Sequence, residues 1–130
     1  MTRVLVFGGR DITDQGFVFS SLSRLRAERG WTTPLIIIQG CARGADSLGR
    51  LWGTLFADDV VDFPVLEAMK ARYGYMEAPK RRNTQMLVEG LPDEAVGFPG
   101  HGGTADMARK AIQALGRDKV VLLGPVTAWQ

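Results

Sequence analysis

Three glycine-rich segments of the chain combine residue types that could hold a phosphate. They read GGRDITD at residues 8–14, GCARGAD at residues 40–46 and PGHGGTAD at residues 99–106. Glycine lets a ligand approach the backbone closely, because no Cβ stands in the way. Each segment directly precedes a helical pattern, and a helix N-terminus offers unpaired N–H groups and a partial positive charge. The three segments therefore predict a site for an anion, and a phosphate-bearing ligand in particular.

The same segments also have a purely structural interpretation. Asp14, Asp46 and Thr104 could cap the helices that follow, and the glycines could simply form turns. None of the segments is a P-loop, since no Gly-Lys-Ser/Thr closes it, and none reads G-x-G-x-x-G. Because three such turns occur in one chain, we favour ligand binding. The turn residues expected to bind the ligand are Gly8, Gly9, Arg10, Asp11, Gly40, Arg43, Gly44, Asp46, Pro99, Gly100, His101, Gly102, Gly103 and Thr104.

Individual side chains near these turns allow two interpretations each. Arg82 could bind a phosphate through its planar guanidinium or, within the basic run 80–82, lie on a solvated face. His101 is the only histidine, and we expect it to be exposed in its glycine loop, either contacting the ligand or serving as a loop residue. Cys41 fits a packed small residue better than a nucleophile, because no histidine lies near it in the sequence. One histidine and one cysteine do not suggest a metal site, and we expect no metal or cofactor.

The segments between these turns predict the elements that must position them. Five apolar runs bounded by glycine or proline, typical of strands buried on both faces, lie at residues 3–8, 35–40, 60–65, 94–98 and 119–124. Helical patterns alternate with them, which predicts a Rossmann-like three-layer α/β/α fold with a mainly parallel five-stranded sheet. Ligands of such folds bind beyond the carboxyl ends of the strands. The three turns follow the first, second and fourth strands, so we expect them at one edge of the sheet.

Apolar periodicity indicates which helix faces turn toward the sheet. The repeating positions are Val18, Leu22 and Leu25 in the first helix, Leu48, Leu51, Trp52 and Leu55 in the second, and Ala105, Ala108, Ile112 and Leu115 in the last. On this pattern Met107 faces away from the sheet, toward the ligand. A shorter helix is expected at residues 83–91, preceded by Pro79. Residues 66–79 are expected to form an irregular connection, whose two tyrosines could stack on a base or pack at the surface.

Composition limits the classes of protein to which the chain can belong. Of its 130 residues, 45% are hydrophobic and 23% charged, as in soluble globular proteins, and the length suits a single domain spanning residues 1–130. A net charge of +2 is too small an imbalance to argue for nucleic-acid or membrane binding. The lone cysteine, the absence of a signal-peptide pattern and the shortness of the apolar runs predict a cytoplasmic protein.

Four segments, in this order and spacing, resemble the SLOG superfamily of Rossmann-like domains: GGRDITD, GCARGAD, RRNTQM at 81–86 and FPGHGGTADM at 98–107. The nearest branch is the YspA/YpsA-related group, and the resemblance extends over residues 3–123. The superfamily includes LOG-type phosphoribohydrolases and sensor domains that bind NAD-derived nucleotides. The resemblance therefore implies a pocket for a nucleotide or nucleotide-derived ligand, such as a nucleoside monophosphate, ADP-ribose or an NAD-like molecule. It also implies a homodimer, because LOG-type relatives associate through helices beside the site.

The resemblance to the hydrolase branch is incomplete. Its motif reads Pro-Gly-Gly-x-Gly-Thr-x-x-Glu, and Met107 stands where that motif has its catalytic Glu. Arg82 and Asn83 occupy the place of the Arg-Lys pair of the hydrolases, which implies that both bind the ligand and that Arg82 takes part in catalysis. The missing carboxylate would have to come from Asp106 or, on the neighbouring turns, from Asp46 or Asp11. Asp106 is adjacent in the sequence, although one helical residue is a rotation of about 100°. The candidate catalytic residues are therefore Arg82 and Asp106.

Three functions remain open on this basis. The missing Glu favours binding of a nucleotide or nucleotide-derived ligand without catalysis. The alternative is a phosphoribohydrolase that cleaves the N-glycosidic bond of a nucleoside 5'-monophosphate. The third, single-stranded DNA binding, is disfavoured because the basic residues are scattered apart from one run at residues 80–82. The expected partners are thus a small nucleotide-type molecule and a second copy of the chain, with no membrane contact.

Overall fold

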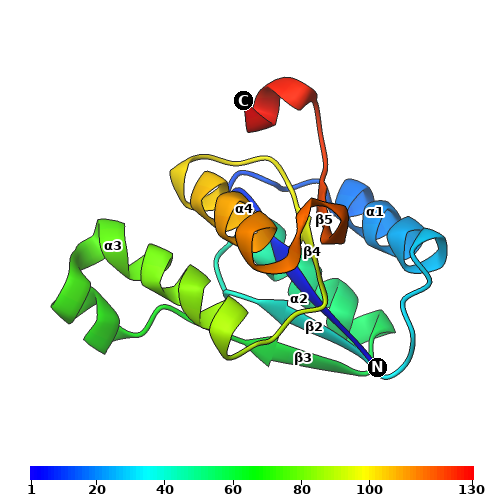
Figure 1. Ribbon diagram of the computed structural model, residues 1–130, viewed down its shortest axis with the longest axis horizontal. Coiled ribbons are helices and arrows are strands. Elements are labelled where there is room, and N and C mark those ends of the chain that lie inside the picture. Colours follow the sequence, from blue (N-terminus) through cyan, green and yellow to red (C-terminus); the bar gives the residue numbers. More distant parts are fainter.

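The computed structural model describes residues 1–130 and confirms the predicted alternation of strands and helices (Figure 1). The strands are β1 (Thr2–Phe7), β2 (Leu35–Gln39), β3 (Asp59–Asp62), β4 (Glu94–Gly97) and β5 (Val120–Leu122). The helices are α1 (Gln15–Glu28), α2 (Ala45–Phe56), α3 (Glu67–Val88) and α4 (Gly102–Leu115). Two short 3-10 turns, η1 (Arg117–Lys119) and η2 (Val126–Trp129), flank β5. None of the helices is both long and apolar enough to cross a membrane.

All neighbouring strands of the sheet run parallel, in the order β3-β2-β1-β4-β5. β1 lies at the centre, where Val4 pairs with Ile37 of β2 on one side and with Glu94 of β4 on the other. This arrangement confirms the predicted Rossmann-like fold with a five-stranded sheet. The winding reverses after β3, so the topological switch point lies between β1 and β4. The turns after β1, β2 and β4 therefore follow three adjacent strands, as predicted.

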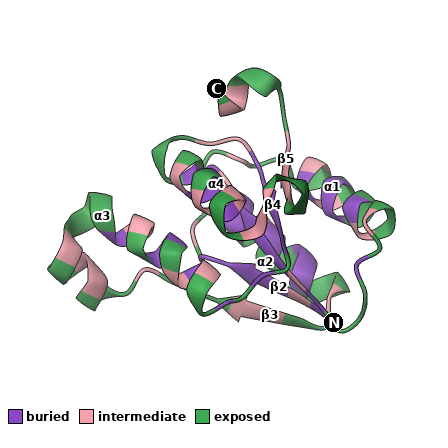
Figure 2. Ribbon diagram, in the orientation of Figure 1, coloured by how far each residue is buried: buried purple, intermediate pink, exposed green.

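Helices cover both faces of the sheet and complete the three layers (Figure 1). α1 and α2 bury Val18, Leu22 and Trp52 against one face, whereas α3 and α4 bury Met86 and Ala111 against the other. Figure 2 shows that buried residues gather on the central strands and on the helix sides that face them. The central strands are therefore covered from both sides, which is why their sequences lack the polar alternation of half-exposed strands.

The face that α2 turns toward the sheet differs in part from the prediction. Gly49 and Gly53 lie against the strands, where a Cβ on either residue would come within 3 Å of side-chain atoms of β1 or β3. These glycines let α2 lie close to the sheet. Trp52, which adjoins Gly53, is buried as predicted. Leu51 and Leu55, which were expected to face the sheet, are exposed instead.

α3 differs most from the prediction. Residues 66–79 do not form an irregular connection, because the chain is helical from Glu67 to Val88 with one interruption at Gly74, whose φ of 81° and ψ of 169° are not helical. Pro79 is the fifth residue of the second helical segment, so its missing N–H removes only a hydrogen bond near the N-terminus of that segment. The helix start expected at residue 83 is therefore about two turns too late, since the second segment begins directly after Gly74. Figure 1 shows that the first half of α3 extends away from the sheet.

The face that α4 turns to the core agrees only in part with the prediction, since Ala108 is buried and Leu115 packs against the core as expected. Its buried residues are Thr104, Met107, Ala108 and Ala111, whereas Ala105 is exposed. These residues recur at intervals of three and four, so the sequence contains two overlapping stripes that fit a helix face equally well. α4 packs on both the sheet and α3, and this double contact selects the stripe with Met107. The expectation that Met107 faces away from the sheet is wrong, since its side chain is 1% exposed and lies in the core.

Candidate functional site

A cavity of about 180 Å³ opens beyond the carboxyl ends of β1 and β4, at the switch point of the sheet. It brings together residues from all three predicted turns and from α3. The predicted residues that line it are Gly8, Gly9, Arg10, Asp46, Arg82, Asn83, His101, Gly103 and Thr104. The predicted residues that do not line it are Asp11, Gly40, Arg43, Gly44, Pro99, Gly100, Gly102 and Asp106. Met107 contributes to its wall from the core side.

The turns after β1 and β4 are held together backbone to backbone. Gly9 N donates a hydrogen bond to Pro99 O at 3.0 Å, and a Cβ on Gly100 would lie 2.7 Å from Gly9 Cα. The close approach of the two turns therefore requires these glycines. Gly102 and Gly103 differ, because a Cβ on either would meet no protein atom within 4 Å. The open space beside them leaves room for a ligand.

α4 begins at the cavity without a side-chain cap. His101 holds the N-cap position, but its side chain makes no capping hydrogen bond and is 92% exposed. Thr104 lies inside the helix and so is not its N-cap. Asp14 does cap α1, where it accepts a hydrogen bond from Phe17 N at 3.0 Å. The first amides of α4 therefore lack the usual acceptor, and they add a partial positive charge to the cavity wall.

Arg82 reaches from α3 to the turn after β2. It is 7% exposed, so the interpretation as a solvated surface residue is wrong. Its Nη1 donates to Gly40 O and, at 3.3 Å, to Phe63 O, whereas its buried Nε has no partner. Burial lowers the pKa of Arg82, an effect that the nearby Asp46 carboxylate opposes. A buried donor without an acceptor is unusual in proteins, and here it belongs to a residue that lines the cavity.

Asp46 brings a carboxyl group to the same cavity. It lies in the first turn of α2 and is 5% exposed, while Gly44 holds the N-cap position, so the capping interpretation is wrong for this residue. Its Oδ2 accepts a hydrogen bond from Ala42 N at 3.4 Å. Burial raises the pKa of Asp46 from 3.8 to about 6, and the charge of Arg82 opposes this rise. The carboxyl group can therefore change its protonation state close to neutral pH.

A comparison with known protein families matches the part of the chain that carries the first two turns. The YspA, cpYpsA-related SLOG family matches residues 2–72, which is more than half of the 130-residue chain. The chain belongs to this family. Membership confirms the predicted SLOG resemblance and suggests a nucleotide-related ligand in general. No curated protein and no solved structure matches the chain.

In this SLOG protein, Asp106 lies beside the cavity but does not line it. Its carboxylate contacts Lys110 Nζ and Arg109 Nη2, both at 2.9 Å, and accepts a hydrogen bond from Asn83 Nδ2 at 3.2 Å. Burial raises the pKa of Asp106, but hydrogen bonds from Lys110 and Asn83 and the nearby positive charges together lower it. Asn83 Nδ2 also donates to Gly103 O at 3.1 Å. These contacts join α3 to the start of α4, and they engage both oxygens of Asp106.

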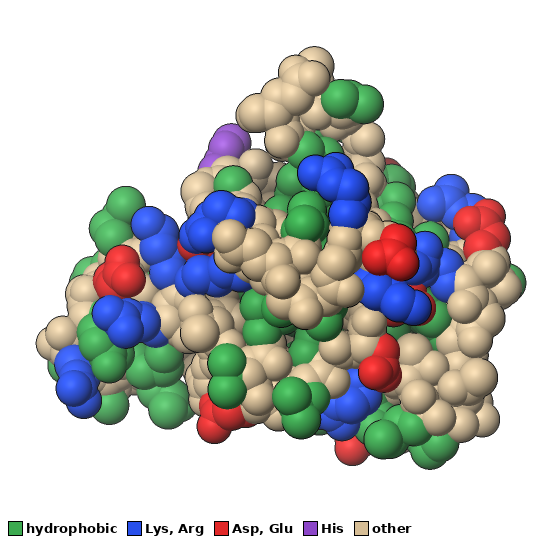
Figure 3. All heavy atoms as spheres, in the orientation of Figure 1, with side chains coloured by type: hydrophobic (Ala, Val, Ile, Leu, Met, Phe, Trp, Pro, Cys, Tyr) green, Lys and Arg blue, Asp and Glu red, His purple; other side chains and the backbone are tan.

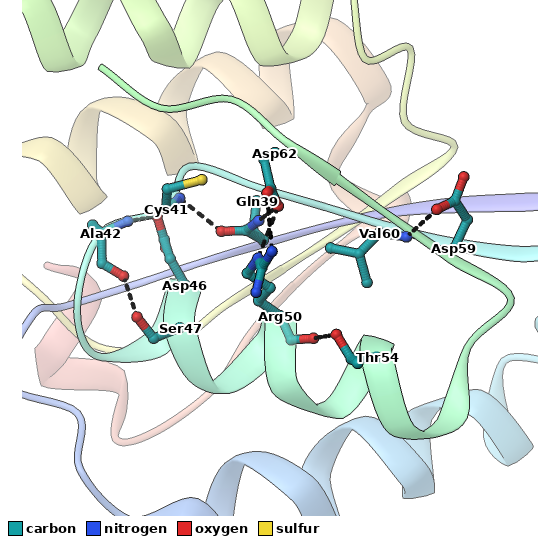
Figure 4. Close-up of polar contacts among 10 residues, drawn as sticks. All are labelled: Gln39, Cys41, Ala42, Asp46, Ser47, Arg50, Thr54, Asp59, Val60 and Asp62. Atoms are coloured by element: carbon teal, nitrogen blue, oxygen red, sulfur yellow. Dashed lines mark hydrogen bonds and ion pairs between the residues drawn. The ribbon is translucent and has the colours of Figure 1, made fainter. Parts of the chain in front are cut away.

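A polar network holds the turn after β2 in the SLOG protein (Figure 4). Gln39, which is fully buried, donates to Asp62 of β3 and accepts from Cys41 N at 2.6 Å. Asp62 also accepts two hydrogen bonds from Arg50, at 3.0 and 3.2 Å. Cys41 has a φ of 63°, and it is exposed rather than packed as predicted. Partial burial of the thiol and the Asp62 carboxylate raise the pKa of Cys41, which opposes a role as an activated nucleophile.

Four residues that line the cavity were not indicated by the sequence: Phe7, Ala42, Pro79 and Met86. Phe7 and Ala42 adjoin or belong to predicted turns, so a wider definition of each turn would have included them. Pro79 and Met86 lie three residues before and four residues after Arg82, on one face of a helix. Extending the expected helix back through Pro79 would have placed them beside Arg82.

Proposed function

We propose that the chain binds a nucleotide or nucleotide-derived ligand with a phosphate in the cavity at the start of α4, and that residues 1–130 act as one binding domain. The observation that carries this proposal is Arg82, which lines the cavity where the uncapped α4 begins, is 7% exposed and has a buried Nε without a partner. A phosphate oxygen would accept a charge-assisted hydrogen bond from the guanidinium and further bonds from the helix amides. Family membership supports a nucleotide-related ligand.

Single-stranded DNA binding has less support. On the face shown in Figure 3, Lys and Arg side chains lie among acidic and apolar ones rather than in one continuous stripe. The tyrosines of α3 already have cationic neighbours, since Arg81 lies 4.6 Å from the ring centre of Tyr73 and Lys70 lies 5.9 Å from that of Tyr75. Binding of a single strand needs a basic groove with aromatic rings available for stacking. A small ligand in the cavity fits these observations better.

Titration of the purified protein with AMP by calorimetry is the direct test of the proposed function. We expect saturable binding at one site per chain, and native mass spectrometry of the same preparation should show a nucleotide-sized ligand that dissociates when AMP is added. The proposal would be wrong if neither AMP, ADP nor ADP-ribose bound at millimolar concentration and no nucleotide co-purified.

Replacing Gly103 with valine should weaken AMP binding strongly and leave the fold intact. No protein atom lies within 4 Å of a Cβ at this position, so the valine would occupy ligand space without displacing the chain. Calorimetry should show an affinity loss of at least about tenfold, with an unchanged circular dichroism spectrum. Ala105→Val is the matched control, because Ala105 is exposed on the same helix and does not line this cavity. Unaltered affinity in Gly103→Val would contradict the placement of the phosphate.

Hydrolysis of the N-glycosidic bond of a nucleoside 5'-monophosphate is the second candidate function, and Asp46 is the observation that favours it. Its carboxyl group lines the cavity with Arg82, and its pKa is raised to about 6. A carboxylate of this kind can act as a general base. Water would attack C1' of the ribose, Asp46 would accept the proton of that water, and the bond to the base would break. The leaving base would take a proton from solvent, and ribose 5-phosphate would be the second product.

Replacing Asp46 with asparagine should change how AMP binding depends on pH. Because burial raises the pKa of Asp46 to about 6, the wild-type side chain is neutral at pH 5 and ionised at pH 8. The two proteins should bind AMP about equally at pH 5, and the variant should bind roughly tenfold more tightly at pH 8, where the wild type holds an anion near the phosphate.

The phosphate of AMP also titrates, because its second pKa is near 6. This titration affects both proteins equally, so the ratio of their AMP affinities at each pH does not depend on it. An affinity ratio that does not change between pH 5 and pH 8 would contradict the proximity of Asp46 to the phosphate. If the wild type releases ribose 5-phosphate from AMP, the same variant should do so at least about a hundredfold more slowly.

A further inference from the structure

A second hollow adjoins the cavity on the side of the projecting helix α3. Its volume is about 310 Å³, and it shares Arg10, Ala42, Pro79 and Arg82 with the first cavity. The two hollows therefore meet across Arg82, which contributes to the walls of both. A single elongated ligand could extend from the start of α4 into this second space.

The charged residues that line the second hollow are all cationic: Arg10, Lys70 and Arg82. Its remaining lining residues carry no charge, and they include Cys41, Tyr75, and Pro64 and Val65 from the connection between β3 and α3. The first cavity differs, because Asp46 lies in its wall. The charges that line the second hollow therefore favour a negative group there as well.

Lys70 has two weak partners within the chain, the carboxylate of Glu67 and the ring of Tyr75, whose centre lies 5.9 Å from Lys70 Nζ. Its side chain is 33% exposed, and its Nζ lies 3.2 Å from a carboxylate oxygen of Glu67, whose side chain is 89% exposed. An ion pair with such an exposed carboxylate contributes little, because water and salt screen it. Arg10 forms no ion pair with any carboxylate of the chain. Both side chains can therefore turn to an anionic ligand without losing a strong interaction.

We infer that the second hollow takes a second anionic group of the same ligand, so that the preferred ligand class is a nucleoside diphosphate rather than a nucleoside monophosphate. This inference rests on the proposed function, because it needs the first phosphate in the cavity at α4. Arg82, which lines both hollows, then lies between the two groups, and its guanidinium can donate to an oxygen of either.

Calorimetric titration of the whole chain with AMP and with ADP, both in the presence of EDTA, tests the inference. We expect ADP to bind the wild type roughly tenfold more tightly than AMP, as one additional charge-assisted contact would give. In Lys70→Met the affinity for ADP should fall to within about threefold of that for AMP, whereas the affinity for AMP should change by less than about twofold. Lys70→Arg should keep the preference for ADP. Lys119→Met is the control, because this lysine is exposed and lines neither hollow.

Three results would overturn the inference while leaving the proposed function standing. The first is equal affinity of the wild type for AMP and ADP. The second is an equal loss for both ligands in Lys70→Met, which would show a structural role for Lys70. The third is the same loss of preference in Lys119→Met, which would show a general effect of net charge. Failure of the wild type to bind either nucleotide would instead contradict the proposed function, and the inference with it.

Discussion

Replacing Arg82 with alanine should weaken AMP binding by about thirtyfold to a thousandfold, which corresponds to roughly 2–4 kcal/mol. The reason is that Arg82 lines the cavity and is only 7% exposed, so its bond to a phosphate would form away from most of the competing water. Calorimetric titration with AMP measures the loss directly.

The same substitution should also destabilise the fold. Arg82 donates to Gly40 O and Phe63 O, so alanine would leave two carbonyl groups without this donor and would open a void between α3 and the sheet. We expect the free energy of unfolding to fall by about 2–4 kcal/mol. Arg82→Lys should be closer to the wild type in stability, because an ammonium can still reach a carbonyl. It should still lose at least about tenfold in affinity, because it lacks the planar fork that serves several acceptors at once.

The neighbouring Arg81 supplies a matched control for these variants. Its side chain is 54% exposed and lies 3.5 Å from Glu77, itself 48% exposed. Removing it should leave AMP affinity within about threefold of the wild type, and the free energy of unfolding within about 0.5 kcal/mol. If folded Arg82→Lys also bound AMP within threefold of the wild type, Arg82 would be a structural residue and the phosphate would lie elsewhere.

The sheet and the position of the cavity could be predicted from the sequence because both follow from local features. Central strands that are covered on both faces are nearly continuous apolar runs, and those of β1 and β2 were located to within one residue. Alternation with helices then implies a parallel sheet, and the glycine-rich turns must follow the carboxyl ends of their strands. Gly8 and Gly103 thus line one cavity although they are far apart in the sequence.

The orientation of the helices could not be predicted in the same way, because it depends on contacts between elements. In α4 the stripe beginning at Thr104 and the one beginning at Ala105 have similar spacing, and packing against α3 decides between them. In α2 the sheet selects Gly49 and Gly53 for their small size, a property that an apolar stripe does not reveal. Arg82 is likewise buried because its side chain extends from α3 to Gly40 O in the turn after β2. A basic run in the sequence does not reveal such a contact between distant elements.

Replacing Met107 with glutamate, which would restore the Glu of the hydrolase motif, should destabilise the protein. The Met107 side chain is 1% exposed and lies in a core cluster with Phe7, Met86 and Ala111, where a carboxylate would lose most of its hydration. We expect the free energy of unfolding to fall by about 3–5 kcal/mol at pH 8. Burial would raise the pKa of the new carboxyl group, so the deficit relative to the wild type should shrink as the pH falls and the group becomes neutral. Thermal or urea unfolding at pH 5 and pH 8 measures both effects.

Ala105→Glu provides the comparison on the same helix, because Ala105 is exposed and lies in the first turn of α4. A carboxylate there should leave the free energy of unfolding within about 0.5 kcal/mol of the wild type, or raise it slightly through the helix dipole. Met107 also lines the cavity. A glutamate side chain at this position could therefore turn into the cavity instead of the core. If Met107→Glu stayed as stable as Ala105→Glu and released ribose 5-phosphate from AMP faster than the wild type, the new carboxylate would have turned into the cavity. The position would then belong to the reaction site rather than to the core.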